Sequence, residues 1–429
     1  MTYFKKKFFA TAFVAGSALV LAGSAFAQGT LPQPKQEKLL NGLKILMWPD
    51  AKADSVTVTV RVHSGTSFDP QGKEGVMRLL SENIFPERAA REFFTEDLGG
   101  GLSVEANYDY IEIIASSKPE NFLTMVETLS AAIANPTIDK PTTAKLRSAL
   151  IDELKKQESD PAYVADNAVA ARMFGTFPYG RPQYGSSTSV AKIDFADLLD
   201  AKQRFLTADN ATVTVVGNFD RPLGFRAMRR YFGAWLKSDK RVPSTFRQPD
   251  PPPAAVISVP SPQPDAFAIR FAIRGSARGD RSFAASEVYA QILETRLKAR
   301  APNANRDDVF VRSESHILPG IIIVGFDGKK SSTANANGKI EAFELVANIL
   351  AEPITDAEFQ AARKLFKETW MKQTVTELFL DFDTFKTASA DADAMAADKV
   401  TVDEVRTFAA SAVKQTPAAI LLNSPATNN

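Results

Sequence analysis

The chain has 429 residues, of which 45% are hydrophobic and 24% charged, and its formal net charge is +1. This balance is typical of a globular protein of two or three domains; it excludes disorder, and the charge shows none of the Lys and Arg excess of nucleic-acid binders. There is no cysteine and there are two histidines, His63 and His316, which excludes thiol chemistry and cysteine-containing zinc sites and nearly excludes any site of neighbouring histidines.

The first 27 residues have the pattern of a secretory signal peptide. Three lysines at positions 5–7 precede an apolar stretch over 8–22, and Ala25, Phe26 and Ala27 form a small-x-small cleavage site. The stretch is short for a spanning helix of roughly 20 residues. We therefore expect cleavage after Ala27 and a periplasmic or secreted mature chain without a membrane span.

The rest of the sequence repeats once, with a period of about half its length. The repeat shows in an alternating strand pattern over 56–62 and again over 267–273, in helices that close at Ala134 and Ala351, and in a helix and strand over 195–216 and again over 403–422. A proline-rich segment over 239–254 separates the copies as a linker. The pattern predicts an α+β fold of two tandem homologous halves, 28–238 and 255–429, each a mostly antiparallel sheet covered by helices on one face.

Several short motifs follow one another in the first half. They are Asn41-Gly42-Leu43-Lys44, Gly75, Leu98-Gly99, Pro178-Tyr179-Gly180-Arg181-Pro182 with Gly185, and the strand from Ala211 to Gly217. In this order the mature chain resembles, over nearly its whole length, the pitrilysin/insulinase-type metallopeptidases, also called inverzincins. The resemblance implies a clamshell of two halves that closes around an extended peptide.

In active members of that family, the helix after the first strand carries H-x-x-E-H, whose histidines bind zinc and whose glutamate activates water. Here Arg78 and Glu82 stand at the histidine positions and Ser81 at the glutamate position, while Glu153 matches the family's third ligand, a glutamate on a later helix. A guanidinium offers no lone pair to a metal, and serine cannot act as the base. The resemblance therefore implies a degenerate motif that holds no metal or other cofactor.

Two interpretations of this helix are open. In the structural one, Arg78 and Glu82 form an i,i+4 ion pair beside a buried apolar stripe. The stripe consists of Val76, Leu79, Leu80 and Ile84. In the other, Glu153 lies near the buried edge of its helix and joins Arg78 and Glu82 in a charge cluster that fills the vacated metal pocket.

The two histidines offer no metal site of their own. His63 falls on the polar side of its strand beside Arg61, where we expect it to be solvated or hydrogen-bonded, and His316 precedes Leu318-Pro319-Gly320, which predicts a hairpin turn. No acidic residue with metal spacing accompanies His316.

In the family's paired forms, the half without zinc contributes an arginine and a tyrosine that bind the substrate. Arg296, Arg300, Arg306 and Phe310 occupy that region here, but no tyrosine follows the arginines, and Phe310 cannot donate a hydrogen bond. These four residues are weak candidates for substrate binding. The alternative for Arg300 and Arg306 is a role as surface charges.

Three functions are compatible with these features. The leading hypothesis is a secreted, inactive family member that forms a heterodimer with an active zinc peptidase paralogue, as its non-catalytic subunit or as a wall of its substrate chamber. The alternative is a stand-alone periplasmic clamp that binds an extended peptide by adding it to a sheet edge. The third is an enzyme with an unrelated site, although no phosphate loop, dinucleotide fingerprint or nucleophile elbow is present.

Overall fold

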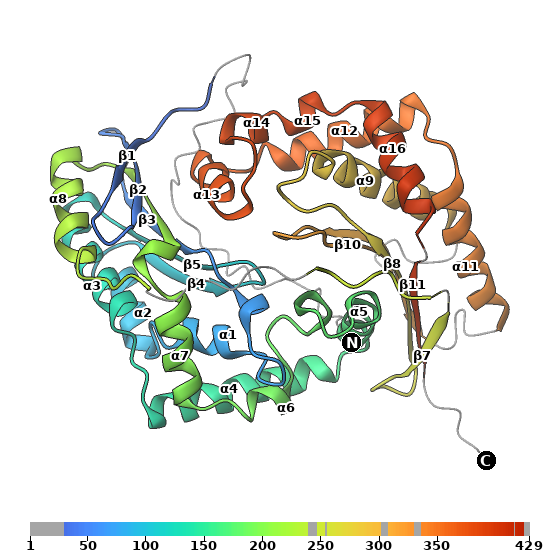
Figure 1. Cartoon of the computed structure of the whole chain (residues 1–429), viewed down its shortest axis with the longest axis horizontal. Helices are drawn as coiled ribbons and strands as arrows, with labels where there is room; N and C mark the ends of the chain where they lie inside the picture. Colours follow the sequence, from blue (N-terminus) through green and yellow to red (C-terminus); the bar gives the residue numbers. More distant parts are fainter. Residues whose placement is uncertain are drawn as a thin grey trace.

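The computed structural model describes residues 30–238, 247–253, 255–301, 308–329, 336–415 and 417–423. The predicted signal segment, most of the predicted linker and Arg306 lie outside these residues. Figure 1 shows two sheets on opposite sides of the molecule, with most helices on their outer faces. No helix in the described part of the chain is long and apolar enough to cross a membrane.

The first sheet has six strands in the order β1-β2-β6-β3-β5-β4. Only β2 and β6 are parallel neighbours. The strands are β1 (Lys35–Lys38), β2 (Lys44–Pro49), β3 (Val56–Val62), β4 (Gly101–Ala106), β5 (Ile111–Ser117) and β6 (Ala211–Gly217). The helices of this half are α1 (Val76–Glu82), α2 (Arg88–Glu96), α3 (Phe122–Ala134), α4 (Lys140–Glu158), α5 (Pro161–Phe174), α6 (Ser187–Val190), α7 (Phe195–Phe205) and α8 (Arg221–Phe232).

The second sheet has five strands in the order β7-β11-β8-β10-β9, of which only β7 and β11 are parallel neighbours. The strands are β7 (Val256–Pro260), β8 (Ala266–Arg274), β9 (Val309–Glu314), β10 (Ile321–Lys329) and β11 (Ala418–Asn423). The helices are α9 (Phe283–Arg300), α11 (Ala336–Ala351), α12 (Asp356–Trp370), α13 (Val375–Phe385), α14 (Ala390–Ala394), α15 (Ala396–Lys399) and α16 (Val402–Val413).

These elements confirm the predicted α+β fold and its internal repeat. The strand pairs β3 and β8, and β6 and β11, hold equivalent places in the two sheets. The helices also lie where the sequence predicted them. Helix α3 ends at Ala134 and α11 ends at Ala351, and α7 and α16 run into β6 and β11.

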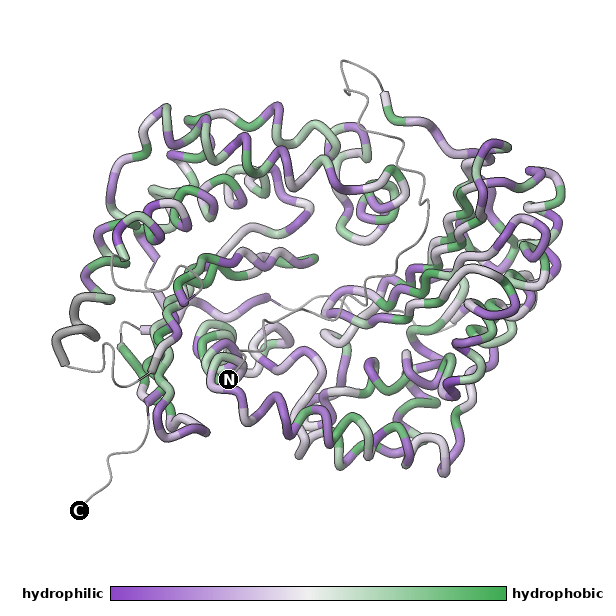
Figure 2. Tube along the Cα trace, turned by 180° about the vertical axis from the view of Figure 1, so that it is seen from behind, coloured by the Kyte–Doolittle hydropathy of each residue, from purple (hydrophilic) through white to green (hydrophobic). Residues whose placement is uncertain are grey.

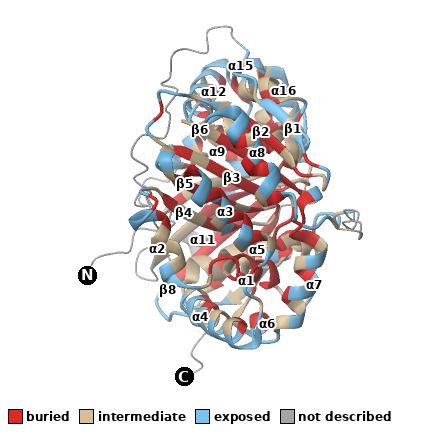
Figure 3. Cartoon of the chain, turned by 90° about the vertical axis from the view of Figure 1, so that its left-hand side faces the viewer, coloured by how far each residue is buried: buried red, intermediate tan, exposed pale blue. Residues whose placement is uncertain are grey.

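The cores follow from the residue pattern of these elements. In β3, Val56, Val58, Val60 and Val62 are all fully buried and pack with apolar residues of the covering helices. Along the helices, hydrophilic and hydrophobic residues alternate (Figure 2), as expected of helices that bury one side. Buried residues accordingly concentrate in the strands at the centre and exposed residues on the outer helices (Figure 3).

In addition, one helix of each half packs against the sheet of the other half. Helix α5, from the first half, packs on β8 and β11, where Val169 and Met173 share a core cluster with Ala272 and Ile420. Helix α13, from the second half, lies against the first sheet, where Phe379 meets Trp48 at 5.3 Å between ring centroids. Both helices lie between the sheets (Figure 1). Within each half the helices cover one face of the sheet as predicted, and the contact with a helix of the other half adds to this arrangement.

Candidate functional site

Helix α1 carries the degenerate motif, and its start is fixed by Gly75 and Asp69. Gly75 has φ +111°, and a Cβ atom there would lie 2.6 Å from Val190 Cγ2, so the position requires glycine. The buried Asp69 carboxylate accepts the backbone N–H groups of Gly75 and Met77 at 2.7 and 2.8 Å. Burial raises the pKa of Asp69 to about 7, although these two hydrogen bonds act in the opposite direction.

The motif positions of α1 bond to one another. Arg78 pairs with Glu82 at 2.8 Å, Glu82 also pairs with Arg91 at 3.0 Å, and the Ser81 hydroxyl donates to the Arg78 carbonyl at 2.7 Å. The Arg78 guanidinium lies over the ring of Tyr184, 5.1 Å from its centroid. The predicted i,i+4 ion pair is therefore confirmed, and so is the apolar stripe, which is buried throughout.

This arrangement does not fit a zinc ion. A cation already occupies the first ligand position, and it lies within hydrogen-bond distance of the second position, where a carboxylate replaces an imidazole. Among the described residues, no group of three or more His, Asp or Glu side chains is placed to hold a metal.

The three-residue charge cluster is not formed as predicted. Glu153 lies on α4 but is exposed, and its side chain accepts a hydrogen bond from Gln157 at 3.2 Å. No hydrogen bond or ion pair joins Glu153 to Arg78 within the described residues. The two groups do share a neighbourhood, because both affect the pKa of Tyr184, which burial raises. The expectation was wrong because Leu150 and Leu154 form the buried side of α4, whereas Glu153 lies on the exposed side of this helix.

Arg296 is a structural residue and not a free substrate ligand. It is buried in α9, and all five of its N–H donors are used. They bond to both carboxylate oxygens of Glu358 and to the carbonyls of Ile349, Glu352 and Pro353. Because no donor is left over, Arg296 could bind a substrate only by giving up one of these bonds, and its role in substrate binding stays a prediction.

Two of the remaining candidates of this region, Arg300 and Phe310, lie in the second half, on α9 and β9. Arg300 is exposed and pairs with Glu352 at 2.6 Å, as a surface charge would. Phe310, on the edge strand β9, packs under the guanidinium of Arg270 at 4.9 Å. Arg306 lies outside the described residues.

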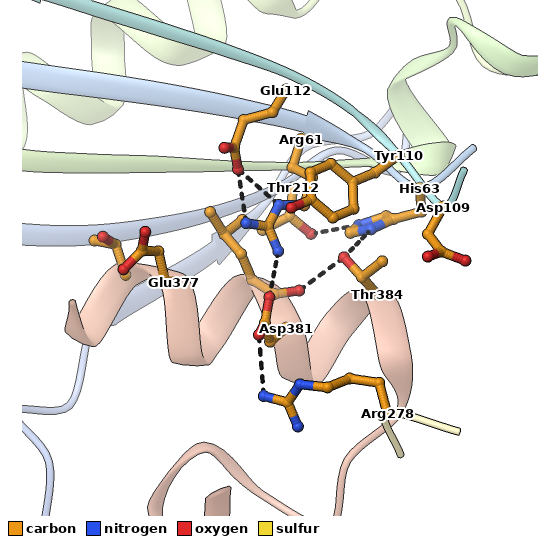
Figure 4. Close-up of polar contacts among 12 residues, drawn as sticks. Arg61, His63, Asp109, Tyr110, Glu112, Thr212, Arg278, Glu377, Asp381 and Thr384 are labelled. Atoms are coloured by element: carbon orange, nitrogen blue, oxygen red, sulfur yellow. Dashed lines mark hydrogen bonds and ion pairs between the residues drawn. The ribbon is translucent and has the colours of Figure 1, made fainter. Parts of the chain in front are cut away.

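A buried charge network joins the two halves, and it was not predicted from the sequence. Arg61 on β3 is 2% exposed and pairs with Glu112 of the same sheet at 2.7 Å and with Asp381 of α13 at 2.7 Å (Figure 4). Asp381 also pairs with Arg278 at 3.0 Å, and Arg278 donates to Asp393 at 2.8 Å. A chain of five charged side chains therefore runs from the first sheet into the second half.

The same arrangement recurs across the internal repeat. Arg270 on β8 is fully buried and pairs with Asp327 of its own sheet at 2.7 Å and with Asp166 of α5 at 2.6 Å. In each half, an arginine on a central strand is therefore paired with a helix that belongs to the other half. The repeat predicted from the sequence aligns Arg61 with Ala272 and Arg270 with Thr59, so it indicated equivalent strands but not equivalent arginines.

Both histidines also lie where the halves meet. His63 is hydrogen-bonded to Thr212 and to Thr384 of α13, at 3.0 Å each (Figure 4), which agrees with one of the two predicted environments. Burial lowers the pKa of His63 to about 4; Lys386, Arg61 and Lys44 act in the same direction, and Asp383 opposes them. His63 is therefore neutral in the folded chain near pH 7.

We expect His63 to make the chain less stable in mild acid. The unfolded chain takes up a proton at His63 below about pH 6.5 and the folded chain only near its lowered pKa of about 4, so stability falls as the pH drops between these values. From about pH 7 to about pH 4.5 the wild type should lose about 2 kcal/mol more than His63→Gln. Urea unfolding at the two pH values measures this difference, and equal losses would contradict it.

His316 provides the opposite case. It lies between β9 and β10, and its Nδ1 atom is 2.9 Å from the Asp109 carboxylate of the first half. Burial alone would lower the pKa of His316, but the hydrogen-bonded Asp109 carboxylate, together with Glu314, outweighs burial and raises it. Protonation of His316 therefore stabilises the contact below the ordinary histidine pKa, and this contribution is lost as the pH rises through the raised value.

An open cavity of about 300 Å³ lies in the second half, beside the charge network. Its lining includes Arg278, Arg281, Thr387 and Lys399 but none of the motif residues of α1. The cavity and the vacated metal position are therefore separate features.

Two family models match consecutive parts of the chain. Residues 44–187 match the model described as Insulinase (Peptidase family M16), and residues 192–366 match the one described as Peptidase M16 inactive domain. The chain therefore belongs to peptidase family M16, the pitrilysin/insulinase-type family that the motifs indicated.

Individual relatives are distant. An uncharacterized zinc protease of Rickettsia felis is 21% identical over 208 residues, which cover 47% of this chain and 50% of that protein; the match spans about half the length of such curated relatives. A protease from Helicobacter pylori has a TM-score of 0.79 at 16% identity, with 92% of this chain and 100% of that chain covered. A peptidase M16 inactive domain from Pseudomonas fluorescens has a TM-score of 0.77 at 17% identity, with 93% and 99% covered. Both structures share the two-half fold.

Proposed function

We propose that this chain is a secreted, catalytically inactive M16 protein that serves as the non-catalytic subunit, or as one wall of the substrate chamber, of an active zinc peptidase paralogue. The observation that carries the proposal is the Arg78–Glu82 ion pair, which takes both histidine positions of the zinc motif. Ser81 stands at the position of the base, and the one carboxylate of this helix, Glu82, is paired with Arg78 and Arg91, so no group at the base position can activate water. Zinc then belongs to the partner alone.

Other parts of the chain support a role that depends on the fold. The helix start at Gly75, the covering helices and both sheets are intact although the ligands of the metal are replaced. Buried charge pairs hold the two halves together. This suits an inactive subunit, which must present a defined binding surface but needs no reactive group. The sequence pattern of residues 1–27 supports export to the periplasm.

We expect the purified chain to bind no stoichiometric zinc and to cleave no peptide, and to copurify from periplasmic extract with a zinc peptidase. Metal analysis and a peptidase assay on the chain alone and on the recovered complex measure both properties. One zinc per chain together with chelator-sensitive proteolysis by the isolated chain would falsify the proposal.

A peptide clamp is the second candidate, and the sheet edges favour it. In the described part of the chain, β4 and β9 each end a sheet and leave one edge of backbone N–H and C=O groups without a strand partner, which is the surface that strand addition uses. Isolation as a monomer with bound peptide, and without a larger partner, would favour the clamp over the subunit.

A further inference from the structure

One corner of the first half combines exposed leucines with unpaired cations. At the β1–β2 turn, the Leu39 and Leu43 backbones bond to each other at 2.9 Å and Gly42 has φ +92°, so the turn is tight and Leu40 stands at its apex. Leu39 is buried, whereas Leu40 is fully exposed, at 106%. Leu40 belongs to none of the hydrophobic clusters formed by the described residues, and a turn apex normally carries a polar residue or glycine.

A second exposed leucine lies at the same corner. The Asn41 side-chain amide donates to the carbonyls of Phe232 and Trp235 at 2.8 and 2.9 Å, which ties the turn to the end of α8. Leu236, the next residue, is 77% exposed. Helix α8 lies beside the β1–β2 hairpin at the left margin of Figure 1, and Figure 3 views the chain from this side.

Cations surround the two leucines. The segment 221–237 contains four arginines and one lysine and no acidic residue. Arg221 pairs with Glu37 at 3.3 Å, whereas Arg226, Arg229 and Arg230 are exposed and have no acidic partner among the described residues. Lys38 and Lys237 extend the exposed charge. Of the acids nearby, Glu37 pairs with Arg221, Asp220 accepts the backbone N–H of Leu223 at the start of α8, and Asp209 accepts the backbone N–H of Ser238. We name Leu40, Leu236 and these cations the basic corner.

We infer that the basic corner binds the surface of an anionic phospholipid bilayer, with Leu40 and Leu236 inserted among the headgroups. Side chains of this kind bury apolar area at the boundary of the acyl chains, while Lys and Arg attract anionic lipids. A protein partner is the less suitable occupant, because the corner protrudes at a turn and its leucines are isolated, whereas protein interfaces have a contiguous core with matching shape. The inference is independent of the proposed function and adds a location for the chain.

The test is vesicle sedimentation with the chain from Gln28 onward, which contains every described residue and omits the apolar segment over 8–22. We expect binding to phosphatidylcholine vesicles that contain phosphatidylglycerol, little binding to pure phosphatidylcholine, and a steep loss with added salt. Arg226→Gln, Arg229→Gln and Arg230→Gln together should weaken the partition coefficient roughly 100-fold at low salt. Leu40→Asn with Leu236→Asn should weaken it about tenfold or more.

Matched controls lie in the second half. Arg281→Gln, Lys364→Gln and Lys372→Gln remove the same number of exposed charges, and Leu365→Asn replaces a leucine that is 44% exposed on α12. These variants should bind as the wild type does, and circular dichroism checks that every variant is folded. Three results would each overturn the inference: equal binding to both kinds of vesicle, equal losses in the control variants, or no binding to either vesicle at low salt. Capture of an acidic protein by the chain would not rescue the inference after any of these results.

Discussion

Replacing Arg61 by alanine is expected to lower the free energy of unfolding by about 3–5 kcal/mol, because it leaves the partly buried Glu112 without its cation and the buried Asp381 with Arg278 alone. Glu112 and Asp381 both bond to Arg61 at 2.7 Å, and they come from different halves of the chain. The loss should therefore weaken both the first sheet and the attachment of α13. Denaturant unfolding followed by circular dichroism measures the change.

Two comparisons make this prediction specific. Arg88→Ala removes an arginine that is 90% exposed and pairs with Glu92 in α2, and it should cost less than about 1 kcal/mol. Arg270→Ala should cost about as much as Arg61→Ala, because its two partners are arranged in the same way across the repeat. If Arg61→Ala cost no more than Arg88→Ala, the network would be dispensable for holding the halves together.

The fold was predictable because periodicity and repetition are properties of the sequence itself. The alternation of Val56, Val58, Val60 and Val62 identifies a strand with one buried face, and its recurrence in β8 identifies the second half. The sequence does not contain the position of α13. The alternation predicts a polar face of β3 but not what covers it, and this face meets a helix more than 300 residues later in the chain, as the Arg61–Asp381 pair shows.

The candidate site was predictable to the extent that its contacts are local. Arg78 and Glu82 lie four residues apart on one helix, so their pairing follows from helix geometry. The contacts of Glu153 and Arg296 depend on which side of α4 and α9 faces the core. For Arg296, the deciding partners are Glu358 and carbonyls more than 50 residues away. No spacing rule connects such residues, so these contacts could not be predicted from the sequence.

Restoring the motif with Arg78→His, Ser81→Glu and Glu82→His is expected to give the chain about one zinc ion per molecule. The Arg78 and Glu82 side chains already meet at 2.8 Å, so two imidazoles at these positions can face one ion. Glu153 is the candidate third ligand, because it matches the glutamate of a later helix that the resemblance implies. Metal analysis after dialysis, with the wild type in parallel, measures the gain.

The control variants separate the effect of the arginine from that of the ligands. Ser81→Glu with Glu82→His keeps Arg78, and it should bind no zinc because the guanidinium repels the ion from the first ligand position. Adding Glu153→Ala to the restored motif should weaken zinc binding but leave the two imidazoles. If the restored chain folds and still binds only traces of zinc, then the exposed position of Glu153 is decisive. In that case the loss of metal binding has two causes, the replacement of two histidines on α1 and the position of Glu153 on α4.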